Sequence, residues 1–211
     1  FDEIFSNFLI NSNIRQKIKK TKKLNKVFDD KPLSIIKEKI NFKLTNDQLK
    51  SIEQINLDLR SNKKMFRLLQ GDVGSGKTIV ALITSLNVIF SNFQVCLMAP
   101  TEILAKQHYN LTKKLFPKDI EVELLTGKTD YSLRKKIIKN LETNKIKMII
   151  GTHALFQEKI KYNSLGLVII DEQHKFGVKQ RKKLSDKGGK DCDVLVMSAT
   201  PIPRTMIMTI F

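Results

Sequence analysis

The fold is decided by residues 65–83, which read MFRLLQ, then GDVGSGKT, then IVALI. A GxxxxGK[ST] pattern between two apolar runs is typical of a phosphate-binding loop that joins a strand to a helix. Glycines permit the positive φ angles with which backbone N–H groups curl around phosphate oxygens, and the helix adds its N-terminal dipole. The predicted nucleotide ligands in this loop are Gly71, Gly74, Ser75, Gly76, Lys77 and Thr78.

The last two residues of this loop and a later acidic pair predict the chemistry. Lys77 reaches the β and γ phosphates, and the Thr78 hydroxyl ligates Mg²⁺. The apolar run LGLVII at 165–170 ends at Asp171 and Glu172. In an Mg²⁺-dependent hydrolase, Asp171 would hold the ion, usually through water, and Glu172 would polarise the attacking water. Alone, such a pair is more often a helix N-terminal feature, but together with the loop it predicts an ATP hydrolase whose cofactors are ATP and Mg²⁺.

Short apolar runs alternate with helical stretches beyond residue 64. The expected strands are 65–69, 95–99, 122–125, 148–150, 165–170 and 194–197, and the expected helices are 79–90, 102–116, 132–141 and 178–184. This alternation predicts an α/β fold with a mainly parallel central sheet that is flanked by helices and buried on both faces. Ligands are then expected at the carboxyl ends of the strands.

The residues before residue 64 predict two amphipathic helices. Phe1 to about Lys26 has apolar residues at helical spacing and a basic stretch over 15–26, which would pack on the next domain or contact DNA. A short linker is expected at 29–32, because Pro32 disfavours helix at the residue before it. Thr45 then stands where the N-cap of the second helix belongs, before Leu49, Ile52, Ile55 and Leu59.

Composition excludes several classes of protein. A hydrophobic share of 41% with 9 Gly and 5 Pro is typical of a globular chain. Membrane spans are not expected, since no apolar run approaches about 18 residues. The net charge of +17 favours polyanions, but the basic residues are 32 Lys and 6 Arg, a bias that AT-rich codons also produce. Cys96 and Cys192 lack any Cys-x-x-Cys partner, so we expect buried core thiols.

Further motifs in residues 42–208 are similar to those of a known family. They are LLQGDVGSGKT at 68–78, MAPTEILA at 98–105 with QHY at 107–109, LTG at 125–127, GTHALFQ at 151–157, DEQH with FGV at 171–178, and SATPIPRT at 198–205. In order and spacing these stretches resemble the motifs of superfamily two helicases with a RecA-like core, and specifically of the RecG branch-migration helicases. The transcription-repair coupling factors share FGV and PIPRT, but they favour Glu where Gln173 stands and lack ALFQ. Lys175 stands where Arg is expected and Ser198 where Thr is commoner, and both replacements keep the donor.

The resemblance assigns roles to residues outside the phosphate loop. Gln48 would read the adenine edge as part of a Q motif at 45–48, or it is an exposed helix residue. His174 would link the Mg²⁺ site, formed by Thr78 and Asp171, to the coupling residues Ser198, Ala199 and Thr200. The implied DNA contacts are Pro100, Thr101, Thr126, Gly127, Gly151, Thr152 and His153. Thr101 and Thr152 each follow a strand and open a helix, so both could also be simple helix caps.

The resemblance also implies the domain organisation and the activity of a longer protein. Residues 1–40 would be a basic helical linker from a wedge domain, and 41–211 the first RecA-like domain of a longer, monomeric, cytoplasmic protein. That protein would couple ATP hydrolysis to branch migration and fork regression on forks, Holliday junctions and duplex DNA. It would need motifs IV to VI of a second RecA-like domain, without which these 211 residues should be nearly inactive. Three other classes stay open: a coupling-factor-like translocase, a P-loop nucleotide switch, and a P-loop transferase for a small molecule.

Overall fold

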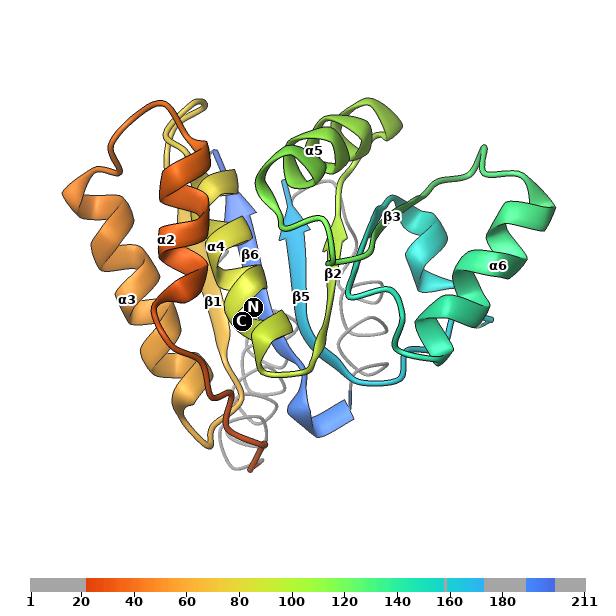
Figure 1. Ribbon diagram of the computed structural model, residues 1–211, viewed down its shortest axis with the longest axis horizontal. Helices are drawn as coiled ribbons and strands as arrows, with labels where there is room; N and C mark the ends of the chain where they lie inside the picture. The colour runs from red at the N-terminus through yellow and green to blue at the C-terminus, as the bar shows by residue number, and fades with distance from the viewer. Residues whose placement is uncertain (1–21, 158, 173–188, 200–211) are drawn as a thin grey trace, which may run out of the picture.

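Six parallel strands form the centre of the structure, a computed structural model that describes residues 22–157, 159–172 and 189–199 (Figure 1). Their order across the sheet is β1-β6-β5-β2-β4-β3. The strands are β1 (Phe66–Gln70), β2 (Gln94–Met98), β3 (Val122–Leu125), β4 (Met148–Gly151), β5 (Leu165–Asp171) and β6 (Asp193–Ser198). Since every pairing is parallel, all six carboxyl ends lie at one edge of the sheet.

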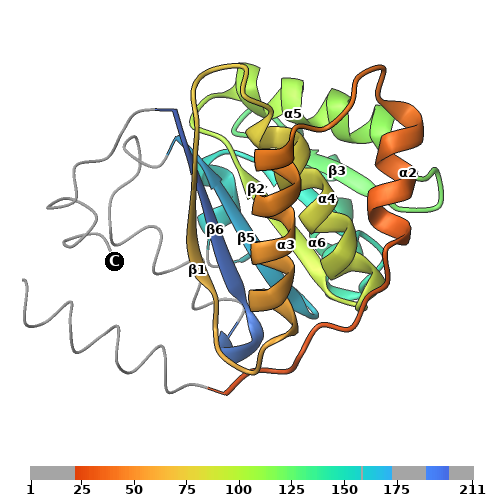
Figure 2. The ribbon, with the colours of Figure 1, turned by 90° about the vertical axis from the view of Figure 1, so that its left-hand side faces the viewer.

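Helices cover both faces of this sheet. The α-helices are α2 (Lys31–Lys39), α3 (Asn46–Arg60), α4 (Lys77–Phe90), α5 (Glu102–Leu115) and α6 (Tyr131–Glu142), and η1 (His153–Phe156) is a short 3-10 helix. Leu167 and Ile169 of β5 belong to the core under α2 to α5, whereas Val168 and Ile170 belong to the core under α6 and η1. Figure 2 shows α2, α3 and α4 together on one side of the sheet. The predicted α/β architecture is confirmed.

The elements expected from residue 45 onward lie where the sequence places them, to within one or two residues. Thr45 caps α3 as predicted, because its hydroxyl accepts the backbone N–H of Gln48 at 3.2 Å. The expected helix at 178–184 lies outside the described residues. Cys96 and Cys192 are buried core thiols, as predicted, and burial raises the pKa of the Cys192 thiol to about 12. Among the described residues, no helix is long and apolar enough to span a bilayer.

The expected linker at 29–32 is wrong, because a helix begins there. Asp30 is the N-cap of α2 and Pro32 lies in its first turn, where the missing N–H of proline costs nothing and its fixed φ suits the helix. Ile36 of this helix is fully buried in the core beneath α4 and α5. Residues 31–39 therefore pack into the same core as the residues after 41, and the boundary at 40/41 stays a prediction.

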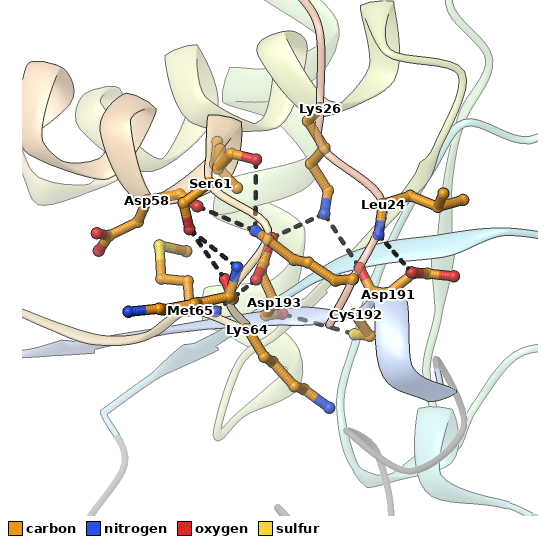
Figure 3. A network of polar contacts seen from close by, with 12 residues as sticks. Leu24, Lys26, Asp58, Ser61, Lys64, Met65, Asp191, Cys192 and Asp193 are labelled. Atoms are coloured by element: carbon orange, nitrogen blue, oxygen red, sulfur yellow. Dashed lines mark hydrogen bonds and ion pairs between the residues drawn. The ribbon is translucent and has the colours of Figure 1, made fainter. Parts of the chain in front are cut away.

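The N-terminal helix was expected to reach Lys26, but residues 22–29 contain no helix, and residues 1–21 lie outside the described range. Two lysines of the predicted basic stretch point inward: Lys23 and Lys26 donate to Asp193 Oδ2 at 2.6 and 2.7 Å, and all three side chains are fully buried. Figure 3 shows Lys26 reaching toward Asp191 and Asp193. Lys26 also donates to the carbonyl of Asp191 at 3.0 Å. These two lysines therefore hold the N-terminal segment to Asp193, the first residue of β6, and they do not form a DNA-facing surface.

Candidate ATP-binding site

The phosphate loop spans 71–76 between β1 and α4. Gly74 has φ +81° and Gly76 has φ +83°, so the two loop glycines hold the left-handed backbone that side chains resist. The Lys77 ammonium donates to the carbonyls of Gly71 at 2.6 Å and Asp72 at 2.8 Å, and so lies across the loop. The loop therefore has the geometry of a phosphate cradle, with a cation beside it and the N-terminus of α4 below it.

Gln48 braces this loop. Its amide oxygen accepts the backbone N–H of Thr45 at 2.9 Å, which completes a capping box, and its Nε2 donates to the Ser75 carbonyl at 2.8 Å. A Cβ at Gly76 would collide with the Gln48 amide, so the loop and this side chain are fitted to each other. Gln48 is thus half-buried and bonded to the loop, and the alternative of an exposed helix residue is wrong. Contact with the adenine base stays a prediction.

Strand β6 joins the phosphate loop to the acidic pair, although β1 and β5 are not neighbours. The Gly71 N–H donates to the Ser198 carbonyl at 3.3 Å, and the Glu172 N–H donates to the Met197 carbonyl at 3.0 Å. The Ala199 N–H donates to Glu172 Oε1 at 3.3 Å. Ser198 and Ala199, the predicted coupling residues, therefore lie between the loop and the carboxylates.

Glu172 is held in an uncommon backbone conformation, with φ +51°. Residues other than glycine adopt this left-handed region at a cost of about 1–3 kcal/mol, and such residues cluster at functional sites. The hydrogen bonds from its own N–H to Met197 and from Ala199 to its carboxylate hold it there. His174 was predicted to link the acidic pair to the coupling residues. His174 and the coupling residue Thr200 both lie outside the described residues.

Asp171 has a partner that the sequence did not suggest. His108 Nε2 lies 2.8 Å from Asp171 Oδ2, and both side chains are about nine-tenths buried. His108 is on the inner face of α5, with Ala105, Thr112 and Leu115. That spacing of three, four and three residues was the available signal, because it directs the ring toward the sheet.

The oxygen donors of the site suit Mg²⁺. A carboxylate at the end of β5 and a hydroxyl in the first turn of α4 belong to the hard ligands that this ion takes together with nucleotide phosphates. Asp171 lies at this edge of the sheet and is 8% exposed. Asp171 and Thr78 would be the residues to hold Mg²⁺, which would supply charge neutralisation at the nucleotide phosphates.

The predicted DNA contacts follow β2, β3 and β4 and therefore share the edge of the sheet at which the ATP site lies. Thr101 is exposed and caps α5, with its hydroxyl accepting the Leu104 N–H at 3.3 Å. Thr152 does not cap: it is buried, and η1 has no side-chain cap. Pro100 is half-buried and Thr126 is buried, whereas Gly127 and His153 are exposed.

Gly151 is a packing residue. It is the last residue of β4 and is buried, and a Cβ there would strike the Leu125 carbonyl of β3. The physical reason for glycine at this position is therefore the close approach of two strands, and its contact with DNA stays a prediction.

Replacing Lys77 with Ala is expected to abolish binding of Mg²⁺·ATP while the fold stays intact. The ammonium contacts only loop carbonyls within the described residues, so its removal takes away the phosphate cation but no core packing. Titration with a fluorescent ATP analogue measures the first effect, and far-UV circular dichroism with a thermal melt measures the second. A large loss of helical signal would instead make Lys77 a structural residue.

The fold and the site define a RecA-like nucleotide-binding domain with a phosphate loop. The sequence profile described as DEAD/DEAH box helicase matches residues 45–209, and the chain belongs to this family. A DEAD box protein from Methanococcus jannaschii is similar in fold, with a TM-score of 0.66 at 22% identity over 85% of this chain and 50% of that chain.

Within this family the chain is similar to RecG, as predicted from its motifs. It is 49% identical to "ATP-dependent DNA helicase RecG" of Aquifex aeolicus and 47% identical to that of Thermotoga maritima, over 100% of this chain and 27% of each relative. A solved structure of RecG bound to a three-way DNA junction superposes with a TM-score of 0.84 at 44% identity, over 100% of this chain and 28% of that one. The chain thus spans about a quarter of the length of these relatives.

Proposed function

We propose that the chain is the first RecA-like motor domain of an ATP-dependent DNA helicase of RecG type. The observation that carries the proposal is the bridge through β6, which brings the phosphate loop and the acidic pair into one site. The predicted DNA contacts follow neighbouring strands at the same edge, so nucleotide and DNA would act on one set of loops. Similarity to RecG relatives over the whole chain supports the choice within the family.

In the proposed reaction, water attacks the γ-phosphate in line, the bond from the γ-phosphorus to the β–γ bridging oxygen breaks, and ADP leaves. Glu172 accepts a hydrogen bond from that water and orients it, while Lys77 stabilises charge on the β and γ phosphates. Asp171 and Thr78 hold Mg²⁺. The Ala199 N–H donates to the carboxylate of Glu172. A shift of Glu172 after phosphate release would therefore displace Ala199 in the coupling motif. Thr101 at the N-terminus of α5 would hold a DNA phosphate without reading its base.

The proposed setting is a longer protein with a second RecA-like domain and a wedge domain, which acts as a monomer in the cytoplasm. Its substrates would be forks, Holliday junctions and duplex DNA, and its outcome branch migration and fork regression. A three-way junction bound to a RecG that is 44% identical to this chain supports branched DNA as the ligand.

The test is the ATPase rate of a protein that contains both motor domains, measured without DNA, with fork DNA and with linear duplex of equal length. Fork DNA is expected to stimulate turnover more strongly than the duplex. Equal stimulation by both would favour the coupling-factor-like translocase. Turnover that ignores both DNAs would contradict the helicase and leave a nucleotide switch or a transferase. Lys77→Ala, which should not turn over, serves as the blank.

A further inference from the structure

The inner face of α5 carries a buried polar contact that the proposed reaction does not yet use. His108 is 7% exposed and Asp171 8% exposed, and His108 Nε2 and Asp171 Oδ2 lie 2.8 Å apart. A carboxylate only accepts hydrogen bonds, so the ring must donate its Nε2 proton. Burial of both groups makes this contact stronger than it would be in water, and leaving either partner alone more costly.

The contact fixes one of the two carboxylate oxygens of Asp171. With Oδ2 bonded to His108, the carboxylate cannot turn about its last bond without breaking the contact. Oδ1 would then be the oxygen that serves a metal ion. Hydrogen-bonded partners of a ligating carboxylate typically change metal affinity or activity by about 10–100-fold. His108 therefore has the position of a group that orients a metal ligand without touching the metal.

The helix that carries His108 begins at the exposed Thr101, one of the predicted DNA contacts. The two residues are separated by about 10 Å along the axis, at about 1.5 Å per residue. Thr112, one turn further on, is fully buried and donates its hydroxyl to the His108 carbonyl at 2.7 Å, a hydrogen bond within α5 itself. A displacement of the first turn of α5 would thus be transmitted through His108 to Asp171.

We propose that His108 is a positioning residue: it orients the Asp171 carboxylate toward Mg²⁺ and links the DNA-facing end of α5 to the metal site. This inference rests on the proposed function for the role of DNA, but its metal half does not. The two halves therefore have separate measurements.

The metal half is tested on the 211-residue chain, by titrating a fluorescent ATP analogue at increasing Mg²⁺ and in EDTA. His108→Leu is expected to raise the Mg²⁺ concentration at half effect by about 10–100-fold. Binding in EDTA should be unchanged, since Lys77 and the loop are untouched. His108→Gln keeps a neutral N–H donor of similar reach and should restore the wild-type midpoint to within a few-fold. An unchanged midpoint in His108→Leu, or a failure of His108→Gln to restore it, overturns the proposal.

One further variant separates positioning from packing, and another replaces His108→Leu if that variant does not fold. Thr112→Val removes a buried hydrogen bond from the same helix face but leaves Asp171 untouched, and it should lower the melting temperature without moving the Mg²⁺ midpoint. An equal shift in Thr112→Val would show that packing is the cause and would overturn the proposal. If His108→Leu does not fold, His108→Asn takes its place, because its shorter side chain stops short of Asp171 Oδ2 and should shift the midpoint in the same direction.

The DNA half is tested on the protein with both motor domains, as the ratio of ATPase rates with and without fork DNA at saturating Mg²⁺. This ratio is expected to fall in His108→Leu and to recover in His108→Gln. A normal ratio in His108→Leu overturns the link to DNA. If the wild-type protein itself ignores DNA, the proposed function fails, while the Mg²⁺ titration still decides the metal half.

Discussion

Mg²⁺·ATP on the 211-residue chain is expected to be hydrolysed about 10³ to 10⁵ times more slowly than on a protein with both motor domains, because an arginine finger contributes that factor. The described arginines are not placed for this task. Arg67 pairs with Asp58 at 2.7 Å, the Arg60 guanidinium lies over the Phe28 ring, and Arg134 belongs to α6 on the opposite face of the sheet. Binding should remain, since the phosphate loop is complete.

The measurement is phosphate release under multiple turnover, beside a direct titration with Mg²⁺·ATP. Glu172→Gln is the matched blank, since it keeps the size of the side chain but cannot polarise water, and the isolated chain should be barely faster than this variant. Rapid multiple-turnover hydrolysis by the chain would contradict the need for a second domain.

Replacing Asp193 with Asn is expected to lower the free energy of unfolding by about 3–5 kcal/mol, because it leaves the charges of Lys23 and Lys26 buried without a counterion. Both ammonium groups lie within 2.7 Å of Asp193 Oδ2. Asn keeps an oxygen for the Met65 N–H, which now donates to Oδ1 at 2.6 Å, so this backbone contact survives. The NH2 group of Asn replaces Oδ2 and cannot accept from either lysine, so the negative charge and the shared acceptor are lost together.

Denaturant unfolding at neutral pH measures this loss. Asp58→Asn is the control: its ion pair with Arg67 is about one-third exposed, so its loss should cost at most about 1 kcal/mol. Equal losses of unfolding free energy in the two variants would contradict the prediction, because the buried charges of Lys23 and Lys26 would then need no counterion. Even with Asp193 present, burial lowers the pKa of Lys23 below 10.5, so the unfolded chain binds more protons at alkaline pH. Stability should therefore rise as pH increases toward 10.5, and the deficit of Asp193→Asn should shrink.

The elements that depend on local pattern could be predicted from the sequence. The run at 165–170 is apolar at every position because β5 is buried on both faces, and the Gly-rich loop is fixed by its own backbone requirements. Pro32 misled the prediction, since the same residue that ends one helix can open another. The site residues on the loop and at the end of β5 followed from chemistry that is specific to these residue types.

The contacts that could not be predicted are those between distant residues. Lysines are almost never fully buried, so a Lys-rich stretch indicates surface. Lys23 is buried because its ammonium donates to Asp193, 170 positions away, and to the carbonyls of Asp58 and Leu59. His108 and Asp171 are likewise 63 positions apart, and neither residue alone signals the other. Tertiary partners of this kind are outside the reach of periodicity and spacing.

The strand order has a consequence for folding of the chain during its synthesis on the ribosome. β1 pairs with β6 alone among the described strands, and β6 is the last of them in the chain. The nascent phosphate loop must therefore leave the exit tunnel attached to a strand that has no neighbour until residues 193–198 emerge, more than 120 residues later. At about 5–20 residues per second this delay is several seconds or longer. Throughout it, β1 exposes an open edge that chaperones or other nascent chains could engage.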